Sequence, residues 1–564
     1  MKSVKALELD SKAIGALPIV NYFIERLELG SLLGKHVSSR ANLKLPHSDT
    51  LLIMLKNILL EREPLYEVPE WIAKHDGGLV GLGGLEPNIL NDDRIGRSLD
   101  ALFLADRATI MTELIVSAVK RFHIQLDQFH NDSTTVTVTG EYKAPTVYKG
   151  KQSAKLKHGI NKDHRPDLKQ LLFCLTVSRD GAVPVHCKVY DGNVTDDTTH
   201  IQTWEAVRRL AGRSDFTYVA DCKLCTRAQM DYLNKEGGKF VTVMPRTRSE
   251  DKWFRQWLQS HQVQWSELLR KPKNELPNCE ESIYWGFESL RLSDEGYRVL
   301  WILSSQKQQL DAQMRQHKVE KTIEELDKLK QRVGSRRLKS KEQINAAVLK
   351  VFQENSSAQW FDWKLVRAET EEFKQKGKGR PGKSTEYEKT TNYHWNFEVL
   401  TNPAMIQQDA ADDGIFPLMT NHCSKSVPMK QVLQEYKYQP YIEKRHEQLK
   451  TVLDAAPVYL KLPYRIEALM FLYFIALLIN ALIERQVRNE MAKQAITHLP
   501  LYPEARKCRC PATERILDIF SDQRRHTLGQ RGSVLKKFVD PLNVLQQEVL
   551  RLLNVPEDIY RQVV

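Results

Sequence analysis

The chain has 564 residues, of which 41% are hydrophobic and 27% are charged, and its formal net charge is +12. This composition is that of a soluble globular protein with a sizeable core, and the length predicts roughly three or four domains. The eight cysteines are too few for a disulfide framework, and the opening MKSVKALELDSKAIGALPIV lacks the apolar segment of a secretory signal. We therefore expect a cytoplasmic protein rather than a secreted scaffold, and the basic excess favours nucleic acid as a partner.

Residues 1–122 are predicted to form a helical N-terminal DNA-binding domain. Several segments carry apolar residues at helical spacing, and Ser48 and Asn91 stand where helix N-caps are expected. Arg94 and Arg97 could face a DNA phosphate backbone, although a solvated helix face has the same pattern in the sequence.

Residues 123–250 are predicted to hold the first part of a mixed sheet. The segment STTVTVTGEY alternates, and LLFCLTVSRDGAVPVHCKVYDG predicts two strands joined at Arg179, Asp180 and Gly181. Helices and strands then alternate through FTYVADC and KFVTVMP. Three leading strands followed by alternating helices and strands indicate a mixed sheet covered by helices.

Residues 251–415 are predicted to be a largely β insertion that interrupts this sheet domain. They include a long charged helix, the low-apolar segment KQKGKGRPGKSTEYEK, and strands near YHWNFEVLTN. Residues 416–490 would complete the sheet domain, and residues 491–564 would form a basic helical C-terminal region. The apolar run 468–483 is short for a membrane span and predicts a buried helix, so we expect no membrane partner.

Two aspartates stand at the ends of predicted strands. Asp132 begins the first strand of the sheet, and Asp221 ends the fourth. In a sheet with three antiparallel strands followed by parallel ones, the first and fourth strands can be neighbours, and the two carboxylates can then converge. Because close carboxylates repel each other, convergence implies Mg²⁺ or Mn²⁺. A lone aspartate at a strand end is more often a cap or a turn residue.

A third carboxylate is expected from a helix packed on the sheet. In YKYQPYIEKRHEQLKT, residues 436–451, Pro440 suits the first helical turn, and an apolar stripe through Ile442 can dock on the sheet. Glu443 and Lys450 share a neighbouring stripe, because their spacing is almost two helical turns.

These motifs resemble the DDE insertion-sequence transposases whose catalytic glutamate lies in a Tyr-x2-Arg-x3-Glu-x6-Lys signature. Tyr436, Glu443 and Lys450 match this signature, whereas Gln439 stands at the arginine position and Arg445 is a weak substitute. The segment HGINKDHRPDLKQLLFCLTVSRDG and the helical N-terminal region also resemble this group.

The resemblance implies an α/β fold with a ribonuclease-H-like catalytic domain that is split by an insertion. It implies that Asp132, Asp221 and Glu443 bind two Mg²⁺ (or Mn²⁺) ions, and that the enzyme nicks transposon ends and joins the 3′-OH to target DNA. A homodimer on double-stranded DNA, associated with the nucleoid, is the expected assembly. The DNA contacts expected from the signature are Tyr436, Gln439, Arg445 and Lys450.

A phosphate-loop pattern admits a different function. GKGRPGKS, residues 377–384, matches the loop of nucleotide-binding proteins, but its flanks do not predict a buried strand and a helix. A flexible basic loop, in which Lys378 and Arg380 enter a DNA minor groove, fits the segment better. A nucleotide-dependent motor on nucleic acid and a catalytically inactive, transposase-derived DNA-binding protein stay open as alternatives.

Two further patterns compete with these assignments. Cys222-x-x-Cys225 is half a zinc site that Cys508-x-Cys510 could complete, although no histidine spacing supports it. Glu467 also follows an isoleucine, but the tyrosine and lysine of the signature are missing around it.

Overall fold

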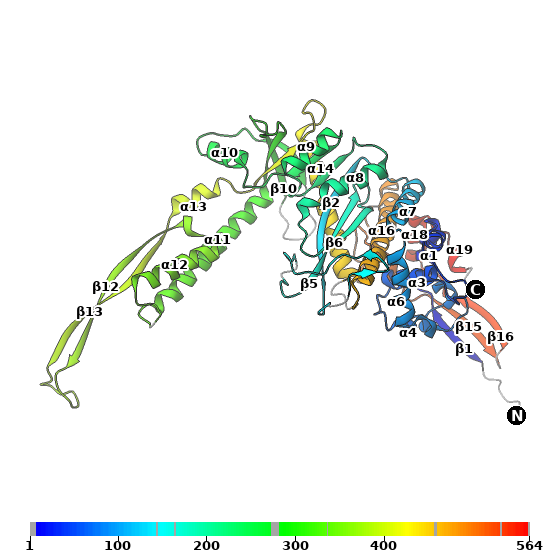
Figure 1. Cartoon of the computed structure of the whole chain (residues 1–564), viewed down its shortest axis with the longest axis horizontal. Coiled ribbons are helices and arrows are strands. Elements are labelled where there is room, and N and C mark those ends of the chain that lie inside the picture. Colours follow the sequence, from blue (N-terminus) through cyan, green and yellow to red (C-terminus); the bar gives the residue numbers. More distant parts are fainter. Residues whose placement is uncertain are drawn as a thin grey trace. The chain divides into compact units, whose positions relative to one another are not determined.

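The structure of the protein is a computed structural model that describes residues 7–142, 145–162, 165–271, 281–335, 337–455, 460–530 and 533–561. The chain divides into two units, coloured along the sequence in Figure 1. The first unit comprises Met1–Thr242, Thr420–His422 and Gln434–Val564, and the second comprises Val243–Met419 and Cys423–Leu433. The second unit is therefore an insertion in the sequence of the first.

Helices make up most of the N-terminal part of the first unit. Asn91 caps α6 as predicted, because its side chain accepts a hydrogen bond from the backbone N–H of Arg94 (2.9 Å). The prediction of a cap at Ser48 is wrong, since α3 already begins at His47 and contains Ser48. The elements are β1 (Glu8–Ala13), α1 (Leu17–Arg26), α2 (Leu29–His36), α3 (His47–Leu59), α4 (Val68–Lys74), α5 (Gly77–Val80), the 3-10 turn Pro87–Leu90, α6 (Asp92–Leu104) and α7 (Arg107–Phe122).

A mixed sheet forms the centre of the first unit. Its strands lie in the order β6-β5-β2-β7-β8, where β2, β5 and β6 are antiparallel neighbours and β7 and β8 run parallel to β2. This confirms the predicted ribonuclease-H-like arrangement, in which the first and fourth strands are adjacent. The elements are β2 (Gln128–Val138), β3 (Val147–Tyr148), β4 (Lys151–Gln152), β5 (Lys169–Ser178), β6 (Pro184–Asp191), the 3-10 turn Asp196–Thr198, α8 (His200–Ala211), β7 (Thr217–Ala220), α9 (Arg227–Lys235) and β8 (Lys239–Val243).

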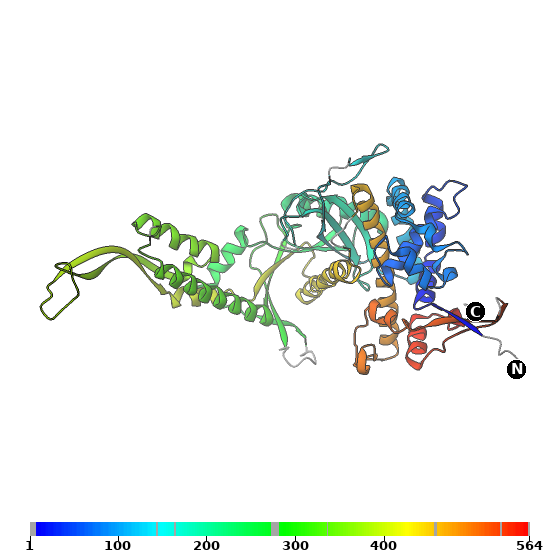
Figure 2. The same cartoon turned by 90° about the horizontal axis from the view of Figure 1, so that it is seen from below.

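Two helices from the later part of the chain cover this sheet. The first is α15 (Pro440–Glu447), which continues into the π-helical turn Gln448–Val452. The second is α16 (Pro463–Lys493), which lies between the N-terminal helices and the sheet in Figure 2 and contains the predicted buried helix. Among the described residues, α16 is the one helix long and apolar enough to cross a bilayer, but 94% of its most apolar window is buried. Such burial is typical of a core helix.

The C-terminal region contains a hairpin that the sequence analysis missed. Strands β15 (Arg524–Gln530) and β16 (Ser533–Val539) pair with β1 in a small antiparallel sheet. The prediction of an entirely helical region is wrong here, because the basic residues interrupt the apolar alternation that identifies strands. The remaining elements are the 3-10 turn Pro503–Ala505, α17 (Thr513–Asp518), α18 (Val544–Leu553) and α19 (Asp558–Arg561).

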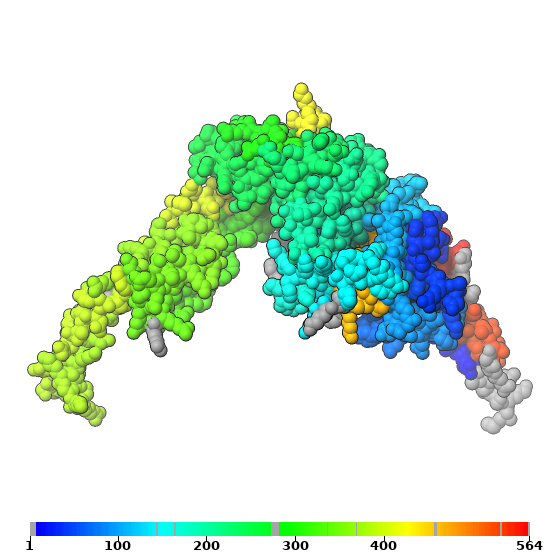
Figure 3. Space-filling model, in the orientation of Figure 1, coloured from blue at the N-terminus to red at the C-terminus, as the bar shows by residue number. Residues whose placement is uncertain are grey.

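The second unit combines strands with two long helices, so it is less dominated by strands than the sequence predicts. Its strands follow the order β14-β11-β10-β9, and a separate hairpin joins β12 to β13. In Figure 3 this hairpin, drawn in yellow-green, extends beyond the helices of its own unit. The elements are α10 (Ser249–Leu258), β9 (Ser266–Lys271), β10 (Ser282–Glu288), β11 (Arg298–Ser304), α11 (Ser305–Gln331), α12 (Lys341–Asn355), the 3-10 turn Ala358–Trp360, β12 (Phe361–Gln375), β13 (Tyr387–Thr401), α13 (Pro403–Ala410), β14 (Ile415–Thr420) and α14 (Met429–Tyr436), whose last turn belongs to the first unit.

Candidate active site

The register of the central sheet brings Asp132 and Asp221 to neighbouring positions. Strands β2 and β7 pair in parallel up to His130 opposite Val219, and continuing this register by two residues sets Asp132 opposite Asp221. Adjacent strands lie about 4.8 Å apart, and residues paired in this way face the same side of the sheet. Asp221 follows the last residue of β7, as predicted, whereas Asp132 lies within β2 rather than at its start.

Helix α15 sets Glu443 over the same part of β2. At one end of this segment, the side-chain oxygen of Gln439 lies 2.8 Å from Nδ1 of His130. At the other end, Nε2 of His446 lies 3.5 Å from Oδ2 of Asp132. Positions 439, 443 and 446 share one helix face, because residues three and four apart are neighbours on a helix. Glu443 therefore lies on the face of α15 that covers His130 and Asp132.

The pKa of Glu443 reports the proximity of a second carboxylate. Partial burial raises this pKa above 4.5, the negative charge of Asp132 raises it further, and the ammonium of Lys162 lowers it. Burial raises the pKa of Tyr436 to about 12, with further contributions from the negative charges of Glu443 and Asp221. The three predicted carboxylates are thus linked electrostatically, Asp132 to Glu443 directly and Asp221 through its effect on Tyr436.

Lys162 is a member of this cluster that the sequence analysis did not single out. Its Nζ lies 3.4 Å from Oδ1 of Asp132 and also donates to the backbone oxygen of Ser133. The residue stands in the segment HGINKDHRPDLKQ, but nothing in its spacing shows that the chain folds back over β2. Its positive charge partly offsets the negative charge of Asp132.

The donor set suits a hard divalent cation. Carboxylate oxygens are the ligands that Mg²⁺ and Mn²⁺ prefer, and a cation would offset both the burial and the negative charge of Asp132 that raise the pKa of Glu443. In the part of the chain that the structure describes, no three His, Cys, Asp or Glu side chains are already grouped closely enough to hold a metal. Binding would therefore require these carboxyl groups to turn toward a common point.

The comparison with known families decides what kind of protein has this cluster. Residues 127–479, more than half of the chain, match the family model described as Transposase DDE domain. The chain belongs to the DDE transposase family. The matched range contains Asp132, Asp221 and Glu443, and it also spans the inserted second unit.

The other comparisons concern the N-terminal region and the whole chain. Residues 9–116 match a family described as a domain of unknown function (DUF4277). No curated protein matches this transposase. It is similar to the cryo-EM structure of a piggyBac transposase synaptic complex with hairpin DNA, at 9% identity and a TM-score of 0.39, covering 98% of this chain and 86% of that one. It is also similar to the Mos1 transposase paired-end complex with left transposon end, at 12% identity and a TM-score of 0.14, covering 40% of this chain and 76% of that one.

Two residues expected to touch DNA are instead buried in the transposase. Gln439, at the arginine position of the signature, is 6% exposed and ties α15 to β2 through His130. Arg445 is 4% exposed, and its guanidinium donates to the carbonyl oxygen of Ala182 (3.0 Å) and pairs with Glu484 (2.8 Å). Since their polar atoms are engaged inside the protein, we no longer expect either side chain to contact a phosphate.

The remaining predicted contacts lie at or near the surface of the transposase. Tyr436 ends α14, and Lys450 lies in the π-helical turn behind Glu443. Arg94 donates to the backbone oxygen of Leu45 (2.7 Å), and Arg97 is exposed and paired with an aspartate one turn earlier. These positions are compatible with DNA contact, which stays a prediction for each of them.

The phosphate-loop pattern lies at the tip of the β12–β13 hairpin. The two strands pair as far as Gln375 opposite Tyr387, and the intervening segment contains Lys378, Arg380 and Lys383. No helix follows the segment, so backbone N–H groups are not aligned at a helix N-terminus as nucleotide binding requires. The nucleotide-binding alternative therefore lacks its structural context, whereas an exposed basic loop, as predicted for Lys378 and Arg380, is present.

The structure does not support a zinc site at Cys222 and Cys225, nor Glu467 as the third carboxylate. Cys222 and Cys225 form a turn after β7, in which the N–H of Cys225 donates to the oxygen of Cys222 (3.2 Å), and no metal-binding group of three is found among the described residues. Glu467 pairs with Arg107 and accepts a hydrogen bond from the backbone N–H of Ala154 (2.9 Å). This glutamate therefore fixes α16 to its neighbours.

Proposed function

We propose that this DDE transposase cuts the ends of a transposon and joins the freed 3′-OH to target DNA. The observation that carries the proposal is that β2 and β7 are parallel neighbours and that Asp132 lies close enough to Glu443 of α15 to raise its pKa, in a chain of this family. The proposed substrate is double-stranded DNA, and the protein would act in the cytoplasm on the nucleoid. Two copies of the chain would act together on the two ends of the transposon.

Asp132, Asp221 and Glu443 would hold two Mg²⁺ or Mn²⁺ ions. Two such ions, when bound, activate the attacking oxygen and stabilise the leaving oxygen of a phosphodiester displacement. The protein would contribute the frame for this chemistry, because the two aspartates belong to the neighbouring strand β2 and the end of β7, and the glutamate belongs to α15. Gln439, docked on His130, holds that helix in place.

Basic side chains around the site would bind the DNA backbone. Lys450, in the turn after α15, would meet a phosphate near Glu443, and Lys162 brings a positive charge beside Asp132. The exposed hairpin tip with Lys378 and Arg380 would contact DNA from the second unit. Most of these contacts would be independent of base sequence, because phosphate contacts position a protein on the duplex without reading its bases.

The test is Mg²⁺-dependent nicking of duplex DNA that carries the ends of the element. We expect Glu443→Gln and Asp132→Asn to bind such DNA as the wild type does but to lose nicking. Glu447→Gln provides the matched control, because this exposed glutamate lies one turn further along the same helix. Since Glu443→Gln removes the repulsion from Asp132, the variant should be at least as stable as the wild type.

Two outcomes would contradict the proposal. Nicking that persists in Glu443→Gln but fails in Glu447→Gln would move the third carboxylate to the control position. Absence of Mg²⁺-dependent nicking by the wild-type protein on its own ends would favour a catalytically inactive, DNA-binding descendant of a transposase.

A further inference from the structure

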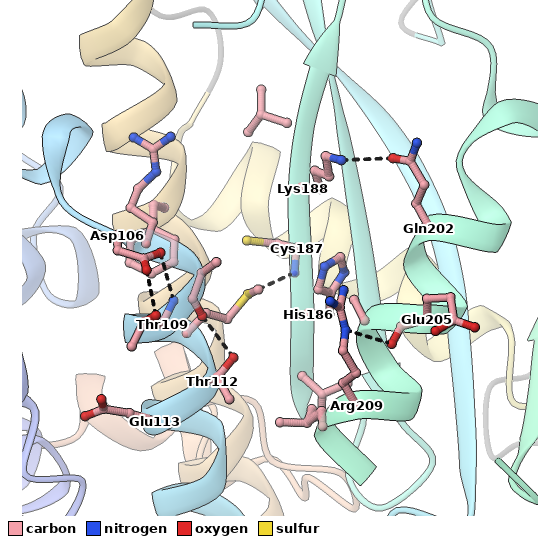
Figure 4. Close-up of a pocket in the computed structure, with 18 of the residues that line it drawn as sticks. Asp106, Thr109, Thr112, Glu113, His186, Cys187, Lys188, Gln202, Glu205 and Arg209 are labelled. Carbon is pink, nitrogen blue, oxygen red and sulfur yellow. Dashed lines mark hydrogen bonds between the residues drawn. The ribbon is translucent and has the colours of Figure 1, made fainter. Parts of the chain in front are cut away.

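A large cavity lies in the first unit at the outer edge of the sheet, apart from the carboxylate cluster. Its volume is about 1030 Å³, and its walls come from the first half of α7, the edge strand β6, α8 and the start of α16. Figure 4 shows β6 between the two helical walls. The transposase chemistry proposed above does not use this cavity.

The side chains of β6 divide the cavity into two parts. Cys187 points toward α7, whereas His186 and Lys188 point toward α8, where Arg209 also lies (Figure 4). Asp132 pairs across β5 with Leu175, which pairs in turn with Cys187. Because side chains alternate along a strand, His186 and Lys188 belong to the face of the sheet opposite the carboxylate cluster.

His186 is a buried polar group without a protein partner. It is 8% exposed, its Nδ1 is fully covered, and the ring makes no hydrogen bond to any described residue. Burial, together with the positive charges of Lys188 and Arg209, lowers its pKa to about 4. Buried polar atoms in native proteins are normally satisfied, so an unsatisfied histidine ring in the wall of a cavity is a feature that needs an explanation, and a bound ligand would provide one.

The two cations beside His186 also lack carboxylate partners. Nζ of Lys188 donates to the amide oxygen of Gln202 (3.0 Å), and Nε of Arg209 donates to a backbone oxygen (3.3 Å), but neither forms an ion pair within the described ranges. The nearest acid on the same wall, Glu205, is engaged by the side chains of Arg208 and Tyr232.

The acids on the opposite wall are engaged as well. Asp106 caps α7, Glu113 pairs with a lysine and a histidine of α2, and Glu467 pairs with Arg107. The wall formed by β6 and α8 therefore presents positive charge that no acid of the cavity neutralises.

We propose that His186, Lys188 and Arg209 form a phosphate-binding site that holds the DNA backbone away from the carboxylate cluster. The proposal rests on the proposed function, since it assumes that the protein binds DNA. An arginine and a lysine supply the positive charge and hydrogen-bond donors that a phosphate requires, and the histidine ring can donate one more hydrogen bond. The cavity has a volume of about 1030 Å³, so it has room for more than one phosphate group.

The test measures DNA affinity as a function of salt for Lys188→Gln, Arg209→Gln and the double variant. The logarithm of the DNA affinity falls linearly with the logarithm of the salt concentration, and each lost phosphate contact should make this slope shallower by about 0.9. The slope of the double variant should therefore be shallower than that of the wild type by about 1.8. Between 50 and 200 mM salt, the affinity of the wild type should then fall about 12-fold more than that of the double variant. Lys235→Gln is the control, because it removes one charge from an exposed lysine at the end of α9.

A second titration separates DNA from free phosphate as the source of the anion. Inorganic phosphate is added to the wild type and to the double variant, and the unfolding temperature is followed. Stabilisation of the wild type alone, together with the reduced salt slope, supports the site as proposed. A salt slope equal to that of the Lys235→Gln control overturns it, whether or not inorganic phosphate binds, while Mg²⁺-dependent nicking by the wild type would leave the proposed function intact.

Discussion

Lys162→Met is expected to tighten the binding of Mn²⁺ to the DNA-free protein. Nζ of Lys162 lies 3.4 Å from Oδ1 of Asp132, a carboxylate that we propose as a metal ligand. The ammonium and a divalent ion therefore compete for the same negative charge. The lysine side chain is 41% exposed, so water screens the pair and its attraction is about 1.2 kcal/mol. Removing the ammonium group of Lys162 should therefore raise the affinity of the protein for Mn²⁺ roughly eightfold.

Calorimetric titration of Mn²⁺ into the wild type, Lys162→Met and Lys162→Arg measures this effect. The arginine variant keeps the positive charge and should bind Mn²⁺ with nearly the affinity of the wild type. Chemical unfolding of each variant checks that loss of the contact with Ser133 has not disturbed β2. An unchanged affinity in Lys162→Met would refute the competition, and a weaker one would mean that Lys162 holds Asp132 in position for the metal.

Three further predictions concern groups outside the carboxylate cluster. In the folded protein the pKa of His186 is lowered from 6.5 to about 4, so as the pH falls the unfolded chain binds a proton before the folded protein does. The free energy of unfolding should therefore fall by up to about 3 kcal/mol between pH 6.5 and pH 4. His186→Gln should flatten this part of the dependence of stability on pH. Arg445→Met leaves Glu484 buried without its main partner and should cost about 3 kcal/mol in denaturant unfolding, with unchanged DNA affinity of the folded protein as the sign that the arginine is structural. Lys378→Gln combined with Arg380→Gln should lower the salt slope of DNA binding by about two without changing the unfolding midpoint, and an unchanged slope would remove the hairpin tip from the DNA interface.

Local patterns in the sequence were sufficient to predict the sheet and to single out two of the carboxylates that we propose as metal ligands. The alternation of STTVTVTGEY in β2 and the short apolar runs of β5 and β7 predict strands, because strands repeat every two residues or, when buried on both faces, are apolar throughout. Asp221 could be singled out because a run of buried residues ends on it. Glu443 could be placed on a helix because Pro440 and the apolar spacing after it identify one.

Other assignments depended on contacts between segments that the sequence does not relate. The chain must fold back over β2 before Lys162 meets Asp132, and α15 must dock before the polar atoms of Gln439 and Arg445 are buried. The segment 377–384 matched a nucleotide-binding pattern by letter, but its place at the end of a hairpin removes the helix on which that function depends.

The sequence by itself determined the main strands and helices of the core and singled out the three carboxylates that we propose as metal ligands, because propensity, capping and apolar periodicity act within a few residues of each position. Only the tertiary structure decided which charged side chains meet water and which meet each other. Strand register set Asp132 beside Asp221, and helix packing buried Arg445 while leaving Lys188 and Arg209 beside a cavity. The physical reason is that desolvation and Coulomb interactions depend on distance in space, and residues hundreds of positions apart become neighbours only when the chain has folded.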